Sequence, residues 1–203
     1  MKITAIKQQE KLKGRYSIFV DDKYTFSLSE SALLDQKLFV GQEIEKGQIA
    51  DYKKLSADDK AYNLTLAYVA RRARSSWELE DYFRRKAYEE ETSRSILEKL
   101  NRLGFVNDEA FARSWVDNRR LLKAVSKRRL SQELRQKRIS DEIIDKVLSE
   151  DETDELDTLR ALVQRKQKQT KYQDKLKLMQ YLARQGFNYD DIKTALKVDN
   201  ELS

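Results

Sequence analysis

The chemistry that this sequence offers most densely is that of guanidinium and ammonium groups. Residues 111–139, which we call the basic segment, hold only two acidic residues, Asp117 and Glu133. Against them stand ten basic ones: Arg113, Arg119, Arg120, Lys123, Lys127, Arg128, Arg129, Arg135, Lys137 and Arg138. Clustered cations suit phosphate, because each neutralised phosphate of a nucleic acid releases condensed counterions.

Two smaller clusters precede the basic segment, at residues 71–74 and 84–86. From the first cluster and the segment we take the candidate binding residues Arg71, Arg72, Arg74, Arg113, Arg119, Arg120, Lys123, Lys127, Arg128 and Arg129. The alternative is a solvated helix face held by pairs four residues apart, such as Glu133 with Lys137. Both interpretations stay open.

The sign of the charge reverses after the basic segment. Residues 141–157 contain nine acidic residues and a single basic one, Lys146. This acidic stretch is either a linker and helix start, since carboxylates are favoured at helix N-termini, or a surface that faces a basic protein partner.

Several kinds of chemistry are excluded because the chain has no cysteine and no histidine. Disulfides, thiolate zinc sites, cysteine nucleophiles and histidine bases all require one or the other. A carboxylate-only metal site and a Ser–Lys pair remain open, but no glycine-rich phosphate loop is present. We therefore expect a protein that binds rather than catalyses, with no catalytic residue, metal or cofactor.

The composition also indicates where the protein works. Of 203 residues, 37% are charged, and the net charge is +6. No apolar run reaches membrane-spanning length, and the N-terminus lacks the apolar stretch of a signal peptide. These features predict a cytoplasmic protein without membrane association, and an anionic partner.

The elements that must position the cations follow two periods. Alternation over residues 2–7, 15–20 and 23–28, with Asp21-Asp22 between the last two, predicts a small three-stranded antiparallel sheet. Ser29 is expected to cap a short helix, and residues 39–49 to form a loop and a short returning strand. From Ser56, an expected N-cap, the period becomes helical. The absence of proline favours helices throughout.

An internal repeat organises the helical part. Leu130, Leu134 and Ile139 align with Leu178, Leu182 and Phe187, and with Leu79, Phe83 and Tyr88 in the other direction. Three units with the same order predict a tandem-repeat protein. The expected fold is mainly α, with tandem three-helix repeats in an elongated curved array, preceded by an N-terminal antiparallel β-sheet subdomain. The expected divisions are residues 1–55, 56–106, 107–150 and 151–203.

Aromatic residues near the cations allow two roles. Trp77 and Trp115 could stack on bases, but they occupy core-like helical positions, which favours packing. Phe105, Phe111 and Phe187 are assigned to the core.

Four strings resemble the RecX family, a group of bacterial regulators of the RecA recombinase. They are residues 74–79 (RSSWEL), 100–112 (LNRLGFVNDEAFA), 126–139 (SKRRLSQELRQKRI) and 182–187 (LARQGF). The resemblance extends from about Asp58 to Val198. Ala87 and Arg138 stand where the family often has glycine, so we expect these turns to close without a left-handed residue.

The resemblance implies the remaining biology. Members of this family are helical repeat proteins that lodge in the groove of the RecA–single-stranded DNA filament and dampen its ATPase, strand-exchange and co-protease activities. It implies the RecA filament and single-stranded DNA as partners, with double-stranded DNA left open, and a monomer acting in DNA repair, homologous recombination and the SOS response. The alternative is a general nucleic-acid-binding helical protein without a recombinase partner.

Overall fold

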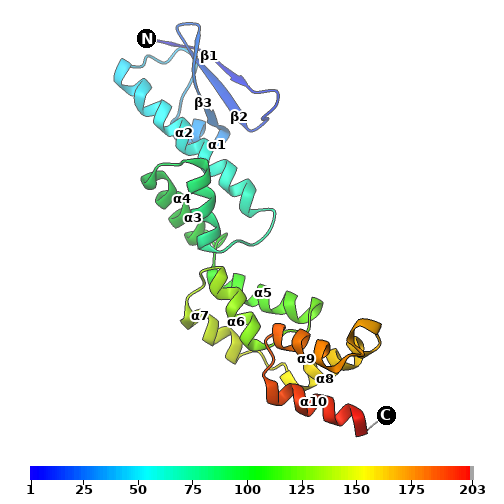
Figure 1. Cartoon of the computed structure of the whole chain (residues 1–203). Coiled ribbons are helices and arrows are strands. Elements are labelled where there is room, and N and C mark those ends of the chain that lie inside the picture. The colour runs from blue at the N-terminus through cyan, green and yellow to red at the C-terminus, as the bar shows by residue number, and fades with distance from the viewer. Residues whose placement is uncertain (202–203) are drawn as a thin grey trace. The chain divides into compact units, whose positions relative to one another are not determined.

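The computed structural model describes residues 1–201, with side chains through Lys197 (Figure 1). The chain forms two compact units. Unit 1 comprises Met1–Arg72 and Tyr82–Phe105, and unit 2 comprises Ala73–Asp81 and the chain from Val106 onward.

Unit 1 opens with the predicted sheet. Strands β1 (Ile3–Gln8), β2 (Arg15–Val20) and β3 (Lys23–Ser29) pair antiparallel in the order β1-β2-β3. Asp21 and Asp22 have φ of 46° and 62°, and two successive positive φ angles give the turn whose twist matches paired strands. The core on this sheet contains Ile3, Ile18, Val20, Phe26, Leu28, Leu38 and Ile44. The expected N-terminal sheet is confirmed.

The connection to the helices differs from the expectation. Ser29 caps helix α1 (Glu30–Asp35), as predicted. However, residues 39–49 form no further strand; a single bridge joins Lys2 to Glu43. Helix α2 (Lys46–Val69) then begins at a capping box made by Glu45 and Gln48, so the predicted start at Ser56 is wrong.

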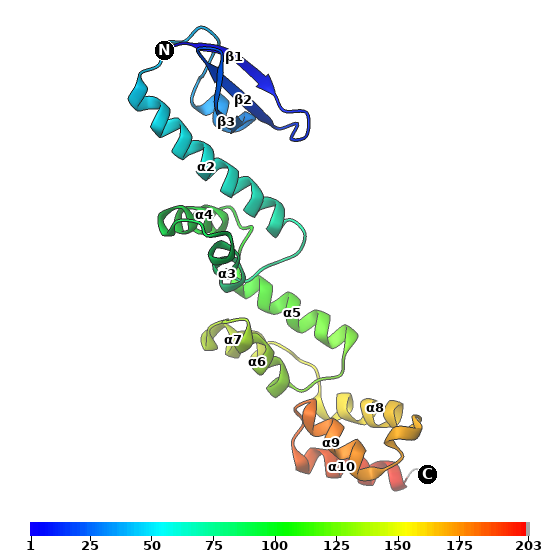
Figure 2. The same cartoon turned by 45° about the horizontal axis from the view of Figure 1, so that its top comes forward.

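The polar residues near Ser56 belong to a contact between α2 and the sheet. Arg15 Nη1 lies 2.7 Å from Asp59 Oδ2, and both side chains are nearly buried. The Ser56 hydroxyl donates to the Ser27 carbonyl at 2.5 Å. Residues of N-cap type are therefore used here as tertiary hydrogen-bond partners inside one uninterrupted helix, which Figure 2 shows running on from the sheet.

Three sets of three helices follow the sheet in the described residues. The first contains the end of α2, α3 (Ser76–Lys86) and α4 (Glu90–Arg102). The second contains α5 (Asp108–Leu122), α6 (Lys127–Gln136) and α7 (Asp141–Ser149). The third contains α8 (Glu155–Gln167), the short 3₁₀ turn η1 (Thr170–Tyr172), α9 (Lys175–Arg184) and α10 (Tyr189–Glu201). The mainly α fold with tandem three-helix repeats is confirmed.

Repeats two and three, both in unit 2, each bury an apolar core of their own. The second core contains Phe111, Ala112, Val116, Val125, Leu130, Leu134, Ile139, Ile144 and Val147. The third contains Leu159, Leu162, Val163, Leu178, Leu182, Phe187, Ile192, Ala195 and Leu196. The apolar positions aligned in these two repeats are the ones buried. The four-part division and the elongated array stay predictions, and the proposed boundary after residue 55 falls inside α2.

The turns between the second and third helices of the repeats correct one expectation. Ala87 and Arg138 have φ of 52° and 58°, and Gly186, at the equivalent place, has φ of 94°. The turns therefore do close through a left-handed residue, although two of the three are not glycine. The reason is the helix ending: Ile139 N–H donates to the Leu134 carbonyl at 3.2 Å, a closure that requires a left-handed residue before it.

The assigned core aromatics divide. Phe111 and Phe187 are buried, as expected. Phe105 is 52% exposed, so its assignment to the core is wrong. It directly follows the turn at Gly104, and the next residue, Val106, takes the buried position instead.

Candidate nucleic-acid interface

The candidate binding residues are divided between the two units. Arg71 and Arg72 follow α2 in unit 1. Unit 2 holds the other eight: Arg74 before α3; Arg113, Arg119 and Arg120 on α5; Lys123 at its end; and Lys127, Arg128 and Arg129 on α6. The structure thus brings α5 and α6 cations together in the second repeat.

A nearly buried carboxylate, Glu133, organises one side of this group. Arg119 Nε donates to Glu133 Oε2 at 2.7 Å, and Arg129 Nε lies 3.4 Å from Glu133 Oε1. The Trp115 indole N–H donates to Glu133 Oε2 at 3.0 Å, while the Arg119 guanidinium lies 4.8 Å from the Trp115 ring centre. Trp115 packs against the second core, as predicted.

Glu133 and Lys137, the example given for the alternative of pairs four residues apart, do not pair with each other. Lys137 Nζ instead contacts Glu78 Oε1 at 2.7 Å, across 59 residues of sequence. Glu133 already accepts hydrogen bonds from Trp115 and Arg119 and pairs with Arg129. The turn after α6 carries Lys137 toward the start of α3. There the Ser75 hydroxyl donates to the Lys137 carbonyl at 3.2 Å.

A similar contact, between the turn of one repeat and the start of the second helix of the repeat before it, recurs between repeats two and three. Ser126 N–H, at the start of α6, donates to the Gln185 carbonyl at 3.1 Å. Ser126 is equivalent to Ser75, and Gln185 to Lys137. A Cβ on the neighbouring Gly186 would lie 2.3 Å from Ser126 Oγ. The turn of one repeat therefore docks on the second helix of the repeat before it, twice within unit 2.

The acidic stretch begins with helix α7, and the linker that follows it, from Glu150 to the cap of α8, contacts the basic segment. Arg120 contacts Asp151 Oδ2 through Nε at 3.0 Å and Nη2 at 2.5 Å. Lys127 Nζ donates to the Asp151 carbonyl at 2.5 Å, and Lys127 N–H donates to Glu155. Asp154 caps helix α8. These contacts support the linker and helix-start interpretation; a basic protein partner facing the stretch stays a prediction.

Hydrogen bonds and ion pairs of this kind shift the pKa values of the side chains that form them. Burial alone raises the pKa of Asp151, but hydrogen bonds from Arg120 and Thr153 outweigh it and lower the pKa below the ordinary value. Arg113 hydrogen bonds to Glu150 and Glu109 and has a raised pKa, while the pKa values of both partners are lowered. Arg113 and Arg120 are thus neutralised by carboxylates of their own unit.

Only some of the candidate cations face solvent and lack an ion pair with a carboxylate of the described residues. Lys123 and Arg128 are exposed, and neither forms an ion pair with any described residue. Arg71 is likewise exposed, whereas Arg74 is half-buried. The aromatic Trp77 is half-buried as well.

Sequence reasoning missed a second basic surface, in the third repeat. Residues 164–177 contain one acidic residue, Asp174, and six basic ones: Arg165, Lys166, Lys168, Lys171, Lys175 and Lys177. We call these six the lysine patch. Its density of basic residues exceeds that of the basic segment, so counting charge in a sliding window would have found it.

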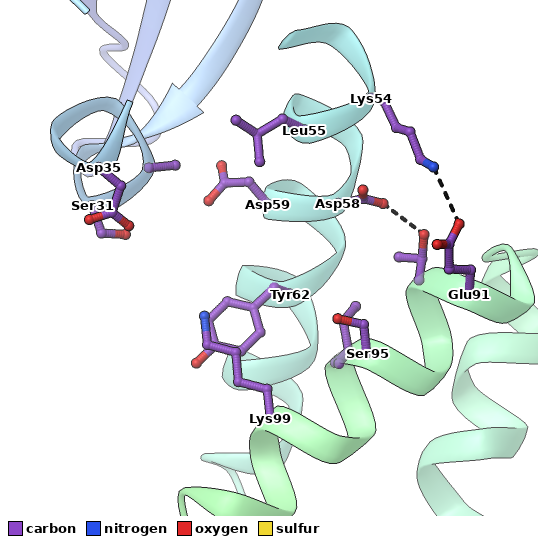
Figure 3. Close-up of a pocket in the computed structure, with 13 residues that line it drawn as sticks. Ser31, Asp35, Lys54, Leu55, Asp58, Asp59, Tyr62, Glu91, Ser95 and Lys99 are labelled. Carbon is purple, nitrogen blue, oxygen red and sulfur yellow. Dashed lines mark hydrogen bonds and ion pairs between the residues drawn. The ribbon is translucent and has the colours of Figure 1, made fainter. Parts of the chain in front are cut away.

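Unit 1 contains a cavity of about 400 Å³ between α1, α2 and α4 (Figure 3). Its polar groups pair with one another: Lys54 with Glu91 at 3.3 Å, and Thr92 with Asp58 at 2.7 Å. Lys99 Nζ lies 4.0 Å from the Tyr62 ring centre. In the described residues, no group of three or more acidic side chains is arranged to hold a metal ion.

No helix within residues 1–201 is both long and apolar enough to cross a membrane.

The fold and the cationic surfaces together define a class: a tandem three-helix-repeat protein with an N-terminal sheet. Models of four RecX domains match the chain in order. The regulatory protein RecX N-terminal domain matches residues 1–45, and the first, second and third three-helix domains match residues 61–100, 107–148 and 152–196. The chain belongs to the RecX family.

Individual relatives agree with this assignment. The regulatory protein RecX of Lactobacillus gasseri is 35% identical over 116 residues, which are 57% of this chain and 42% of the relative. That of Listeria monocytogenes serotype 4b is 37% identical over 112 residues, 55% of this chain and 42% of the relative. The match thus spans less than half the length of these curated relatives.

Two solved structures are also similar. A crystal structure of regulatory protein RecX has a TM-score of 0.75 and 28% identity, covering 97% of this chain and 98% of that one. The crystal structure of RecX from Lactobacillus salivarius has a TM-score of 0.59 and 26% identity, covering 69% of this chain and 94% of that one.

Proposed function

We propose that this protein binds the filament formed by RecA on single-stranded DNA and lowers its ATPase, strand-exchange and co-protease activities. The observation that carries this proposal is the ordered match of all four RecX domains along the chain. Relatives of this chain bear the name regulatory protein. Regulation of a bound partner requires no catalytic group, metal or cofactor here, and the cytoplasm is where such a filament would be met.

The cations of unit 2 support an anionic partner. Lys123 and Arg128 expose their charged groups at the end of α5 and the start of α6. Arg113, Arg119, Arg120, Lys127 and Arg129 contact acidic residues of the same unit, so in this proposal they shape the surface that Lys123 and Arg128 present. Exposed cations near a polyanion also accelerate the encounter.

The test is a titration of RecA–single-stranded DNA filaments with the full chain while ATP turnover is followed. Turnover should fall as the protein is added. The variant Lys123→Glu/Arg128→Glu should inhibit less. The slope of the logarithm of its binding constant against the logarithm of salt concentration, the salt slope, should drop by roughly 0.7 for each single-strand phosphate that it no longer neutralises. The matched control, Lys11→Glu/Lys13→Glu, changes exposed residues of the sheet subdomain and should inhibit like the unmodified protein.

Unchanged ATP turnover at a stoichiometric ratio would end the proposal. The second candidate, a general nucleic-acid-binding protein, would gain from the same series. It predicts that naked single-stranded DNA is bound as tightly as the filament. The basic composition, with a net charge of +6, is the feature that favours it.

A further inference from the structure

The two basic surfaces of unit 2 differ in what surrounds their charges. In the second repeat, Arg113, Arg120 and Lys127 are held by acidic residues 150–155. In the lysine patch, one ion pair is formed among the described residues, between Lys177 and Asp174 at 3.6 Å. The cations of the lysine patch therefore face solvent almost without acidic partners. In the second repeat, several cations are paired with carboxylates of the same unit.

The patch occupies one short stretch of the fold. Its members lie at the end of α8, in the connection through η1, and in the first turn of α9, which Figure 2 shows as the loop joining these two helices. Helices α8 and α9 both pack against η1. Five of the six side chains are exposed: Arg165, Lys168, Lys171, Lys175 and Lys177.

Two half-buried tyrosines hold part of the patch in place. Lys166 Nζ lies 5.3 Å from the ring centre of Tyr172 and 4.9 Å from that of Tyr181. Lys171 Nζ lies 5.6 Å from the Tyr172 ring centre. The two rings are 5.0 Å apart and pack on the third core. An ammonium group near an aromatic face is attracted to it without losing its charge, so these lysines are positioned yet remain available.

The composition of the patch distinguishes between partners. Protein interfaces are depleted in lysine, and five of the six cations here are lysines. Lysine is a compact, hydrated point charge on a flexible stem, which suits a phosphate chain whose oxygens are not fixed in one geometry. We propose that the lysine patch is a second surface, in addition to Lys123 and Arg128, on which this protein holds the phosphate backbone of single-stranded DNA. This assignment rests on the function proposed above.

The experiment uses the full chain and a fluorescent oligo(dT) strand. The variant Lys168→Gln/Lys171→Gln/Lys175→Gln removes three exposed charges and leaves both tyrosines in place. The control, Lys11→Gln/Lys13→Gln/Lys23→Gln, removes three exposed charges from the sheet subdomain. Anisotropy titrations over a range of salt concentrations give affinity and slope. An abasic strand of equal length is measured in parallel.

We expect the patch variant to lose at least about tenfold in affinity and roughly 2 units of salt slope, because each phosphate contributes about 0.7. The loss should be equal on the abasic strand, and the control should keep the unmodified slope. Circular dichroism should show the same helicity for all three proteins, because the substituted side chains are exposed.

Other results would overturn the assignment. Equal losses in both variants would mean that only net charge matters. Unchanged DNA binding with lost filament inhibition would mean that the patch faces an acidic protein surface. Unchanged DNA binding with full filament inhibition would reject the patch and leave the proposed function standing. Failure of the proposed function is separate: the unmodified protein would bind oligo(dT) but leave filament ATP turnover unaltered.

Discussion

Three equivalent residues, Ala87, Arg138 and Gly186, adopt the same left-handed backbone conformation. A residue with a Cβ atom pays about 1–2 kcal/mol for this conformation, and glycine does not. Repeats one and two accept that cost because the conformation lets the following N–H reach back to the helix, as Ile139 does to Leu134.

Substitutions at two of these positions should therefore have opposite effects. Arg138→Gly should raise the free energy of unfolding by about 0.5–1 kcal/mol, the relieved strain less the added freedom of the unfolded chain. Gly186→Ala should lower it, because the new Cβ would lie 2.3 Å from Ser126 Oγ at a φ of +94°. Urea denaturation of both variants measures the two shifts. A less stable Arg138→Gly protein would show that the arginine side chain contributes more than the strain costs.

Residue identity predicts burial better than it predicts charge partners. The apolar spacing of Leu130, Leu134 and Ile139 correctly marked a core face, because helical period alone determines which side chains share a face. The spacing of Glu133 and Lys137 was equally regular, yet Lys137 pairs with Glu78. A long, flexible cation can reach several carboxylates, and only the tertiary fold decides among them.

At the scale of elements, one nearly buried carboxylate, Asp151, helps to anchor the connection from α7 to α8. Asp151 is 8% exposed and contacts Arg120, whose side chain is 13% exposed. Its own backbone carbonyl also accepts from Lys127. The connection is thus fixed to both α5 and α6, the first two helices of the second repeat.

Removing this anchor should destabilise the protein in a pH-dependent way. Asp151→Ala should cost about 3 kcal/mol at pH 7, since it leaves a nearly buried Arg120 without its partner. The folded-state pKa of Asp151 is lowered, so its contribution is complete above the unfolded value of about 3.9 and is lost as pH falls through the folded value. The difference between variant and unmodified protein should therefore shrink below about pH 4.

Denaturation at pH 7 and at pH 3 measures that difference. Asp145→Ala, on the exposed face of α7, is the control and should change little at either pH. A difference that stays constant with pH would contradict a role for the Asp151 charge.

Element type was more predictable than element boundaries. The change from period two to a helical period separated sheet from helices correctly, because side-chain alternation follows directly from backbone geometry. The start of α2 was misplaced because Ser56 and Asp59 resemble an N-cap in sequence but serve Arg15 and Ser27 in the fold. The lysine patch was overlooked because it spans the end of one helix, a connection and the start of the next helix, whereas the basic clusters recognised in the sequence lie in the earlier repeats.

For the whole molecule, we predict an elongated shape because the cores are separate. The sheet, the second repeat and the third repeat each bury an apolar cluster of their own, and 37% of the residues are charged. A compact chain of this length would have a radius of gyration of roughly 17 Å. Small-angle scattering should give a clearly larger value; a radius near 17 Å would contradict the array.

Helix α2 also determines how unit 1 comes apart. It packs on both β3 and α4, with no break between Lys46 and Val69. If the middle turns of a helix unfold, both of its ends lose stability, because helix formation is cooperative along the chain. Amide protons of the sheet and of α4 should consequently exchange with solvent in one shared opening event, so that unit 1 behaves as a single foldon despite its mixed architecture.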